Sequence, residues 1–481
     1  MMSQPGQLRR QLLIAAGIGL PWLLVILLNL HPAPLRLSHA FQQASLAETH
    51  LSLQKAASAT TVILEFQPWR TDLWVKLGQF YLQAGKWQDA IQSLEIAANR
   101  PGFTTEGLIL LGKAYWLGGS PKLAINTWQP LVASGKAPIQ THADLAALQR
   151  QEGDLAGAAQ TLQSWIERQP GNAHPLLELG FVLAVHDPAL AVEALDKAAA
   201  IDRSLSSQIF QLRKALRKED CGSEVKCTMQ TGRALAGLGQ WDLAALLFEQ
   251  AVAQSPDHAE AWAFLGEAQQ QTGKDGFAAL QHAESLSPTS PTVRALMSLY
   301  WRRQGKPEMA QVFLRALAAL EPEQAAWQIE LGNTAAEAGD LKAAMNHFQK
   351  AASLEPENPL VWASLARFCV DYATNLREEG LPAARRLLML SPQDATAHVL
   401  MGRILFDLRD FASAERFLLQ AIQLDDNNAY AHLVLGQFYL QSENYDFASY
   451  HLQRALSLSK PDQMEGMLAS RLLERFFPLR Y

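Results

Sequence analysis

A small residue recurs along this 481-residue chain at a nearly constant interval, and this recurrence constrains the fold more than any other feature. The interval is 34 residues, apart from one interruption after Gly180 and two later steps of different length. The recurring position is occupied by Gly78, Gly112, Ala146, Gly180, Gly232, Gly266, Ser298, Gly332, Ala366, Gly402 and Gly436. A period of this length indicates stacked copies of one supersecondary unit, each contacting its neighbours.

The unit itself reads as two short amphipathic helices joined by a turn. Residues 74–81 place apolar side chains at helical spacing, Gly85 interrupts the pattern, and a second apolar run follows over residues 90–97. Pro101 ends the second helix. Because Gly78 has no side chain, the two helix backbones can approach closely there, which predicts an antiparallel helical hairpin.

These spacings resemble the tetratricopeptide repeat, whose pattern is W-x2-L-G-x2-Y, then A-x3-F, then P. The matching residues are Trp74, Leu77, Gly78, Tyr81, Ala90, Leu94 at the F position, and Pro101. Eleven copies lie between residues 71 and 462, and residues 37–70 form a degenerate twelfth that lacks the aromatic anchors. The resemblance implies an all-α fold, an α-solenoid in which about 12 helix-turn-helix repeats form a right-handed superhelix.

The register divides the chain into segments. A proximal arm is predicted over residues 37–204, with repeats starting at 37, 71, 105, 139 and 173. A distal arm is predicted over residues 225–462, with repeats starting at 225, 259, 291, 325, 359, 395 and 429. Residues 463–481 are predicted to form a capping helix and tail, which a repeat array needs to cover its last apolar face.

Residues 205–224 interrupt the period and predict one extra amphipathic helix that links the two arms. Ile209 and Leu212 fall on its apolar side, whereas Arg213 and Lys214 fall on a basic side. A basic face of this kind is either solvated or in contact with an anionic membrane, and the first is the more ordinary explanation. Cys221 and Cys227 follow, and the sequence leaves open whether they form a disulfide or two free thiols.

The amino terminus predicts a membrane anchor. Residues 11–30 carry no charge and are long enough to span the hydrocarbon core as a helix, although a cleaved signal peptide is the alternative. Arg9 and Arg10 precede the segment and predict a cytoplasmic amino terminus at residues 1–10, with the repeats outside the cytoplasm. The expectation is therefore a single-pass membrane protein.

Composition and motifs argue against several classes of function. The formal net charge is -6, so no basic excess supports nucleic-acid binding. The three cysteines include no C-x2-C pair, and the chain contains no phosphate-binding loop, H-E-x-x-H or G-x-S-x-G motif. His398 and His432 share the register of Trp74, Trp262 and Trp362, so packing explains them better than metal binding. We expect no enzyme activity, no metal and no cofactor.

The resemblance also implies a recognition surface, because repeats of this family line a concave groove with positions 2, 5, 9 and 12. Carried onto this chain, these positions predict a basic stripe made of Arg233, Arg302, Asn333, Arg367 and Arg403. Neighbouring lining positions predict apolar pockets at Val399, Phe406, Tyr430 and Leu433. The stripe would grip a carboxylate of a peptide partner, unless its arginines pair with acids of adjacent helices.

The expected function is therefore a non-enzymatic, membrane-tethered scaffold that binds protein or peptide partners in its groove and assembles an envelope complex. The alternative is a regulatory or adaptor subunit of a membrane enzyme, such as one of polysaccharide synthesis or secretion. No segment long enough for a fused catalytic domain remains outside the repeats.

Overall fold

A computed structural model describes residues 36–43, 52–217, 222–460 and 463–477, and within these ranges the regular structure is helical, with no strand. The elements are α3 (Leu53–Phe66), α4 (Thr71–Gln83), α5 (Trp87–Ala98), α6 (Thr105–Leu117), α7 (Pro121–Ala133), α8 (Ile139–Gln151), α9 (Leu155–Arg168), α10 (Ala173–Leu183), α11 (Pro188–Ile201), α12 (Leu205–Gln208), α13 (Phe210–Leu216), α14 (Glu224–Gly237), α15 (Trp241–Gln254), α16 (Ala259–Gln271), α17 (Phe277–Leu286), α18 (Pro291–Arg303), α19 (Pro307–Leu320), α20 (Ala325–Glu337), α21 (Leu341–Leu354), α22 (Pro359–Asp371), the π-helix η1 (Leu376–Gly380), α23 (Leu381–Leu390), α24 (Ala395–Asp407), α25 (Phe411–Leu424), α26 (Ala429–Gln441), α27 (Tyr445–Leu458) and α28 (Met464–Phe476). The predicted all-α fold is confirmed.

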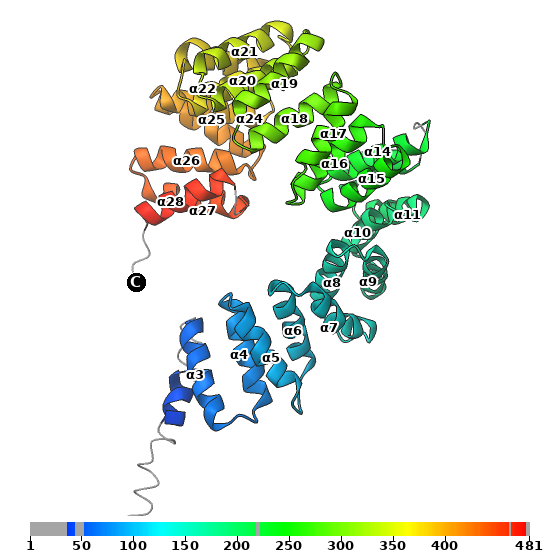
Figure 1. Cartoon of the computed structure of the whole chain (residues 1–481). Helices are drawn as coiled ribbons and strands as arrows, with labels where there is room; N and C mark the ends of the chain where they lie inside the picture. The colour runs from blue at the N-terminus through cyan, green and yellow to red at the C-terminus, as the bar shows by residue number, and fades with distance from the viewer. Residues whose placement is uncertain (1–35, 44–51, 218–221, 461–462, 478–481) are drawn as a thin grey trace, which may run out of the picture. The chain divides into compact units, whose positions relative to one another are not determined.

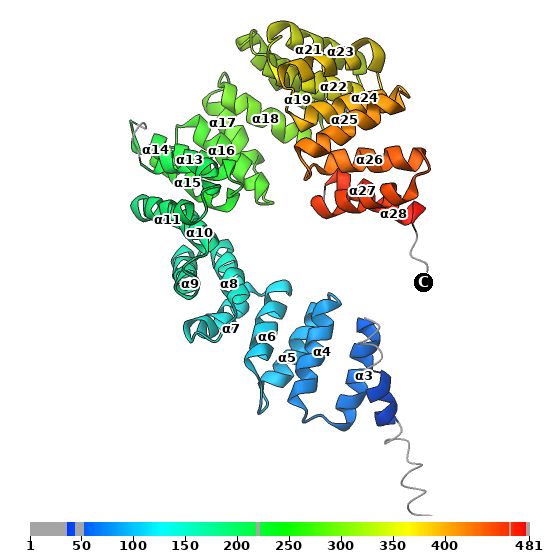
Figure 2. The same ribbon diagram turned by 180° about the vertical axis from the view of Figure 1, so that it is seen from behind.

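The helices pack as the predicted hairpins. Within the repeats, α4 packs on α5, α24 on α25, and α26 on α27, and these pairs lie side by side in both views of the chain (Figures 1 and 2). The small position explains the closeness, since a methyl group added at Gly436 would lie 2.7 Å from the side chain of Leu452 in the facing helix. The same holds at Gly78, where Leu94 fills the space that a side chain would need.

The chain separates into two compact units, one up to Leu247 and one from Phe248 on, and the boundary lies within α15. In the first unit, the fully buried Trp128 packs between α6 and α7 and donates its indole N–H to the carbonyl of Ile109. In the second unit, a continuous core runs through the hairpins from α20 to α25 and includes the buried Phe348 and Leu400. The predicted arm boundary at residues 205–224 stays a prediction.

The linking segment differs from the single helix that the sequence predicts. Its described part forms two short helices, α12 and α13, because the backbone leaves helical geometry at Ile209 (φ -89°, ψ 0°) while burying that side chain completely. Leu212 is buried as predicted, whereas Phe210 is 57% exposed. Arg213 and Arg217 both form ion pairs with Asp196 of α11, so part of the basic side is a packing contact.

The cysteines fall into two environments. Cys227 is disulfide-bonded, whereas Cys369 is a free thiol buried in the core of α22. Burial raises the pKa of the Cys369 thiol to about 12, so this residue behaves as a small apolar side chain. Cys221, the residue for which the sequence left a bond to Cys227 open, lies outside the described residues.

The predicted single-pass membrane localisation is wrong for the part of the chain that the structure describes, because no helix there is long and apolar enough to cross a membrane. The longest of these helices have 14 residues, whereas a span needs about 20 apolar ones. The segment 11–30, on which the prediction rested, lies outside the described residues, as do Arg9 and Arg10.

The carboxyl end of the second unit is covered by α28. This helix packs against α26 and α27, and its buried Ala469 contacts the apolar surface formed by Leu433 and Leu452 (Figures 1 and 2). The first turn of α28 also lies against one of the cavities described next.

Candidate functional site

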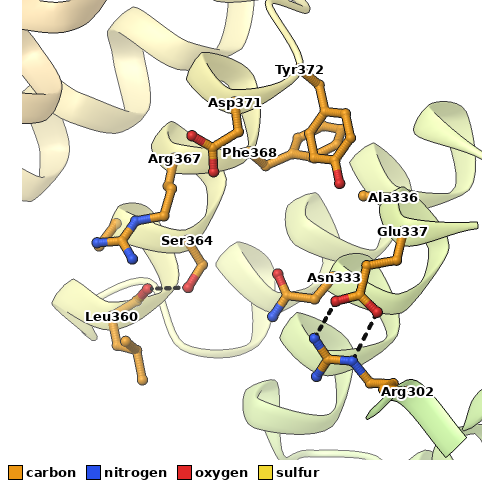
Figure 3. A pocket seen from close by; sticks show the side chains of 11 residues that line it. Arg302, Asn333, Ala336, Glu337, Leu360, Ser364, Arg367, Phe368, Asp371 and Tyr372 are labelled. Atoms are coloured by element: carbon orange, nitrogen blue, oxygen red, sulfur yellow. Dashed lines mark hydrogen bonds and ion pairs between the residues drawn. The ribbon is translucent and has the colours of Figure 1, made fainter. Parts of the chain in front are cut away.

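The first helices of successive repeats in the second unit line two adjoining cavities. One has a volume of about 330 Å³ and is lined mainly by α20 and α22, with Arg302 of α18 at its edge (Figure 3). The other, of about 700 Å³, is lined by α22, α24, α26 and the first turn of α28. Arg367, Asp371 and Tyr372 line both cavities. We call the two cavities together the distal groove.

Arg302 is bound by carboxylates of the next repeat. Its Nη1 donates to Glu330 at 2.6 Å. Its Nε donates to Glu337 at 3.0 Å, with a second bond from Nη2 to the same carboxylate (Figure 3). The hydrogen bonds that Arg302 donates to Glu337 raise the pKa of its guanidinium. A partner could reach Arg302 only by displacing these carboxylates.

Arg403 is held in a similar way. Its Nε donates to Asp407 at 3.0 Å, one helical turn further along α24, and its Nη1 donates to Gln437 of α26 at 2.7 Å. Its guanidinium also lies 5.9 Å from the ring centre of Phe406. Arg403 therefore ties α24 to α26, although the acid that it binds lies on its own helix and the adjacent helix supplies an amide.

Arg367 differs from these two arginines. It is exposed at the junction of the two cavities, and within the described ranges it makes no hydrogen bond and no ion pair. In Figure 3 no dashed line joins its guanidinium to any drawn neighbour. Asn333, on the facing helix α20, also lines the first cavity and makes no hydrogen bond to another described residue.

Asp371 and two tyrosines complete the charged part of the groove. Desolvation raises the pKa of Asp371, and this effect is only partly offset by the positive charges of Arg367 and Arg403. Burial also raises the pKa of Tyr430, which responds to the same arginines and to Asp371. These mutual influences place the four groups in one electrostatic cluster, with Tyr372 at its edge.

The predicted apolar pockets are mostly core. Leu433 is 2% exposed and packs under α28, and Phe406 is a half-buried member of the packing between α24 and α26. Val399 is 1% exposed, yet together with the half-buried Tyr430 it contributes to the wall of the larger cavity. Of the four predicted residues, only these two line the distal groove.

Arg233 does not join the other predicted groove residues. It lies on α14, in the first compact unit, where it lines a separate hollow of about 370 Å³ with Lys214 and Gln230. Arg302, Asn333, Arg367 and Arg403 all belong to the second unit, so the structure brings four of the five stripe residues into one unit.

The sequence prediction missed the acids that face the stripe. Glu337, Asp371 and Asp407 occupy position 13 of three successive repeats, one helical turn after Asn333, Arg367 and Arg403 at position 9. This spacing was visible in the sequence, but position 13 is absent from the lining pattern of the family. Met464 and Glu465 were missed because they follow the last repeat.

The aromatic register position has a structural role. Trp74, Trp262 and Trp362 each donate the indole N–H to the carbonyl six residues earlier, at 2.7–3.0 Å. His398 and His432 place Nε2 at 2.9 and 3.1 Å from the equivalent carbonyl, which agrees with the packing interpretation. Throughout the described helices and loops, no group of three or more His, Cys, Asp and Glu side chains could hold a metal ion.

A comparison with known protein families agrees with this repeat architecture. The family model described as "Tetratricopeptide repeat" matches residues 75–138, 229–291, 298–359, 365–429 and 399–462, which together make up more than half of the chain. The chain belongs to the tetratricopeptide repeat family. Tetratricopeptide arrays present extended concave binding surfaces, and at this level the chain is a protein-binding scaffold.

Curated tetratricopeptide relatives match parts of the chain. The peroxisomal targeting signal receptor of Komagataella phaffii is 31% identical over 135 residues, which cover 27% of this chain and 22% of the receptor. The BBSome complex member BBS4 homolog of Drosophila melanogaster is 23% identical over 327 residues, covering 66% of this chain and 64% of the relative. The chain thus spans only about a fifth of the length of the first relative.

Solved structures with similar helical arrays include a chain of the APC/C hetero-tetramer Cut9–Hcn1 and yeast Tom70. Each is 15% identical to this chain, with TM-scores of 0.41 and 0.43, respectively. The aligned regions cover 92% and 91% of this chain, and 96% and 95% of the respective solved chains.

Proposed function

We propose that the distal groove binds an extended segment of a protein partner and that Arg367 holds an acidic group of that segment. The chain then acts as a non-enzymatic scaffold whose recognition site lies on the first helices of the repeats that start at 325, 359, 395 and 429. The observation that carries this proposal is the state of Arg367, an exposed guanidinium between two cavities with no ion pair to a described residue.

A free guanidinium favours binding for two reasons. It offers a carboxylate two parallel hydrogen bonds, and no internal carboxylate has to be displaced first. At Arg302 and Arg403, by contrast, binding of the same group requires the rupture of existing bonds to Glu337 and Asp407. Of the predicted groove arginines in the second unit, Arg367 is therefore the one that a partner reaches at the lowest cost.

Two further features support a segment rather than a small molecule. The cavities have volumes of about 330 and 700 Å³ and share one wall, so a ligand at Arg367 extends into both. The unpaired amide of Asn333 provides donors and an acceptor for a peptide backbone, beside the first cavity. The envelope setting inferred from the predicted membrane span is not part of this proposal, and no observation favours the adaptor alternative.

The test uses the full-length chain and an array of 12-residue peptides of varied sequence, each with a free and with an amidated carboxyl terminus. We expect Arg367→Asp to weaken binding of the peptides that the unchanged protein selects by at least about tenfold, because a charge-assisted pair is replaced by repulsion. Arg385→Asp on α23 is the matched control, since Arg385 is exposed and lies outside both cavities.

Arg403→Ala is less suitable as a first test, because it removes the bonds between α24 and α26 as well as a charge. If no peptide binds, or if Arg367→Asp and Arg385→Asp bind the selected peptides equally well, the distal groove is not the recognition site.

A further inference from the structure

Two pairs of opposite charges with the same spacing behave differently in the distal groove. Arg403 and Asp407 are four residues apart on α24 and form an ion pair at 3.0 Å. Arg367 and Asp371 have the same spacing on α22, but they form no ion pair with each other or with another described residue. The repeat that starts at 359 therefore carries an open pair where its neighbour carries a closed one.

The neighbouring repeats explain why one pair is open. Arg403 is fixed from the far side by Gln437, the position-9 residue of the next repeat, which orients its guanidinium toward Asp407. The position-9 neighbour of Arg367 is Arg403 itself, whose like charge cannot bind it. In the other direction Glu337 is already occupied by Arg302, so the preceding repeat supplies no acid either (Figure 3).

We infer that the partner segment carries residues of opposite charge two positions apart, a carboxylate for Arg367 and a cation for Asp371. This inference rests on the proposed function and specifies its partner. Side chains four residues apart on a helix are separated by about 6 Å, and an extended chain rises about 3.3 Å per residue. Successive side chains of an extended segment point to opposite faces, so residues two positions apart match the spacing of Arg367 and Asp371.

The charge balance of the groove excludes an acid-rich segment as the best ligand. Arg302 and Arg403 are already neutralised by Glu330, Glu337 and Asp407. The remaining charges on the cavity walls are Arg367, Asp371 and Glu465, which sum to one negative charge. A second carboxylate on the partner would find no free arginine and would face these two acids.

The surroundings of Asp371 favour a cation at that point. Desolvation by the groove walls raises its pKa, so an approaching ammonium or guanidinium group stabilises its ionised form. Tyr372, which is 41% exposed, and the half-buried Tyr430 line the same cavity and present aromatic rings to which a cation is attracted.

The experiment compares three versions of each peptide selected on the array, carrying at the paired positions an acid and a lysine, an acid and an alanine, or two acids. For the unchanged protein we expect the acid–lysine version to bind at least about fivefold more tightly than the acid–alanine version, and the diacidic version to bind most weakly. Asp371→Lys should reverse this order and favour the diacidic version, and Asp371→Asn should abolish the preference for lysine.

Asp446→Lys on α27 is the matched control for the change of charge, because Asp446 is exposed and does not line either cavity, and it should leave the order unchanged. If binding depends on Arg367 but Asp371→Lys and Asp371→Asn keep the original order, the paired-charge inference is wrong while the proposed function stands. If binding does not depend on Arg367, both fail. Equal melting temperatures of the variants exclude misfolding as the cause of a changed order.

Discussion

At the fourth position of the repeat, chemically different side chains make one and the same hydrogen bond. Trp362 and His398 both donate a ring N–H to the carbonyl of the proline six residues earlier, Pro356 and Pro392. In these repeats the bond joins the start of a hairpin to the end of the one before it. The sequence could predict the shared register of the tryptophans and histidines, but not the bond, because the carbonyl acceptor has no signature in the sequence.

His432 occupies the same position and also contacts a histidine of the facing helix. Its Nε2 lies 3.1 Å from the carbonyl of Asp426, and its Nδ1 lies 3.0 Å from Nδ1 of His451 in the facing helix. With His432 donating through Nε2, its Nδ1 accepts from the Nδ1–H of His451, so two neutral rings satisfy the geometry. Two charged rings would place N–H groups against each other.

The buried histidine pair makes the last repeat sensitive to acid. Burial lowers the pKa of both rings, and the pKa of His451 falls to about 4. Because the folded state binds fewer protons than the unfolded state, the stabilisation is complete above the unfolded pKa near 6.5 and is lost as the pH falls toward 4. We expect the free energy of unfolding of this repeat to decrease by on the order of 1–2 kcal/mol between pH 7.5 and pH 5.

His451→Phe is the variant that tests this expectation, because it recreates the His398–Phe417 ring pair of the preceding repeat. Urea unfolding followed by circular dichroism at both pH values should show a smaller loss of stability for the variant than for the unchanged chain. Asp426 and Arg454 face the pair from the neighbouring turn and helix and are present in both proteins, so they do not produce a difference. Equal losses would show that the pair does not control the acid response.

At the scale of the elements, the sequence predicted what depends on repetition and missed what depends on local exceptions. The hairpins follow from the period, since the small residue at Gly332 or Gly402 marks where two helices cross. The repeat that starts at 359 contains such an exception. Ala373 has a positive φ at the turn position where Arg409 and Glu443 also have one, and the two extra residues are absorbed beyond it, by a second positive φ at Asn375 and the π-helix η1.

In the distal groove, too, the repeat pattern predicted the positions of the side chains but not their individual contacts. Arg302, Arg367 and Arg403 could be placed on one face from the register, and the structure places them in one unit. Which of them is free could not be predicted, because it depends on whether the side chain at position 9 of the next repeat is an amide or a second cation. That is a contact between repeats, and a pattern within one repeat does not contain it.

The close crossing in the last hairpin allows a direct test of the packing. A methyl group at Gly436 would meet Leu452 at 2.7 Å, so Gly436→Ala should destabilise α26 and α27 by about 1–3 kcal/mol. Leu452→Ala alone leaves a cavity and should cost about 2–5 kcal/mol. In the double variant the new methyl occupies part of that cavity, so the loss should be smaller than the sum by at least about 0.5 kcal/mol.

Amide hydrogen exchange of α26 and α27 measures these losses locally, which suits an array that does not unfold as one body. Gly237→Ala is the matched control, since a methyl group there meets no atom within 4 Å and the change should be neutral or stabilising by up to about 1 kcal/mol. Strictly additive losses at Gly436 and Leu452 would contradict the close crossing.

At the scale of the whole molecule, an array of this kind is stabilised by contacts between neighbours rather than by one central core. Each hairpin of the second unit covers the apolar face of the one before it, and α28 covers the last. A destabilising substitution should therefore affect mainly its own hairpin, and the loss of stability should decrease from one hairpin to the next. This behaviour separates a repeat array from a globular domain of equal length, which would lose its structure cooperatively.

Removal of α28 tests this principle. A chain ending at Lys460 exposes Leu433, Leu452 and Ala455, which are at most 2% exposed when α28 is present. Because each apolar side chain returned to water costs about 1.5–3 kcal/mol, protection of α26 and α27 against hydrogen exchange should fall by at least about tenfold. Protection of α20 and α21 should change little, and that of α4 and α5 not at all.

Two point variants of α28 provide the control. The side chain of Leu472 packs into this interface, so Leu472→Asp should reproduce the effect of the truncation. Met467 lies on the exposed side of α28, so Met467→Asp should not. Uniform loss of protection along the second unit would show that its repeats unfold as one body, and unchanged protection of α27 would show that α28 does not stabilise the array.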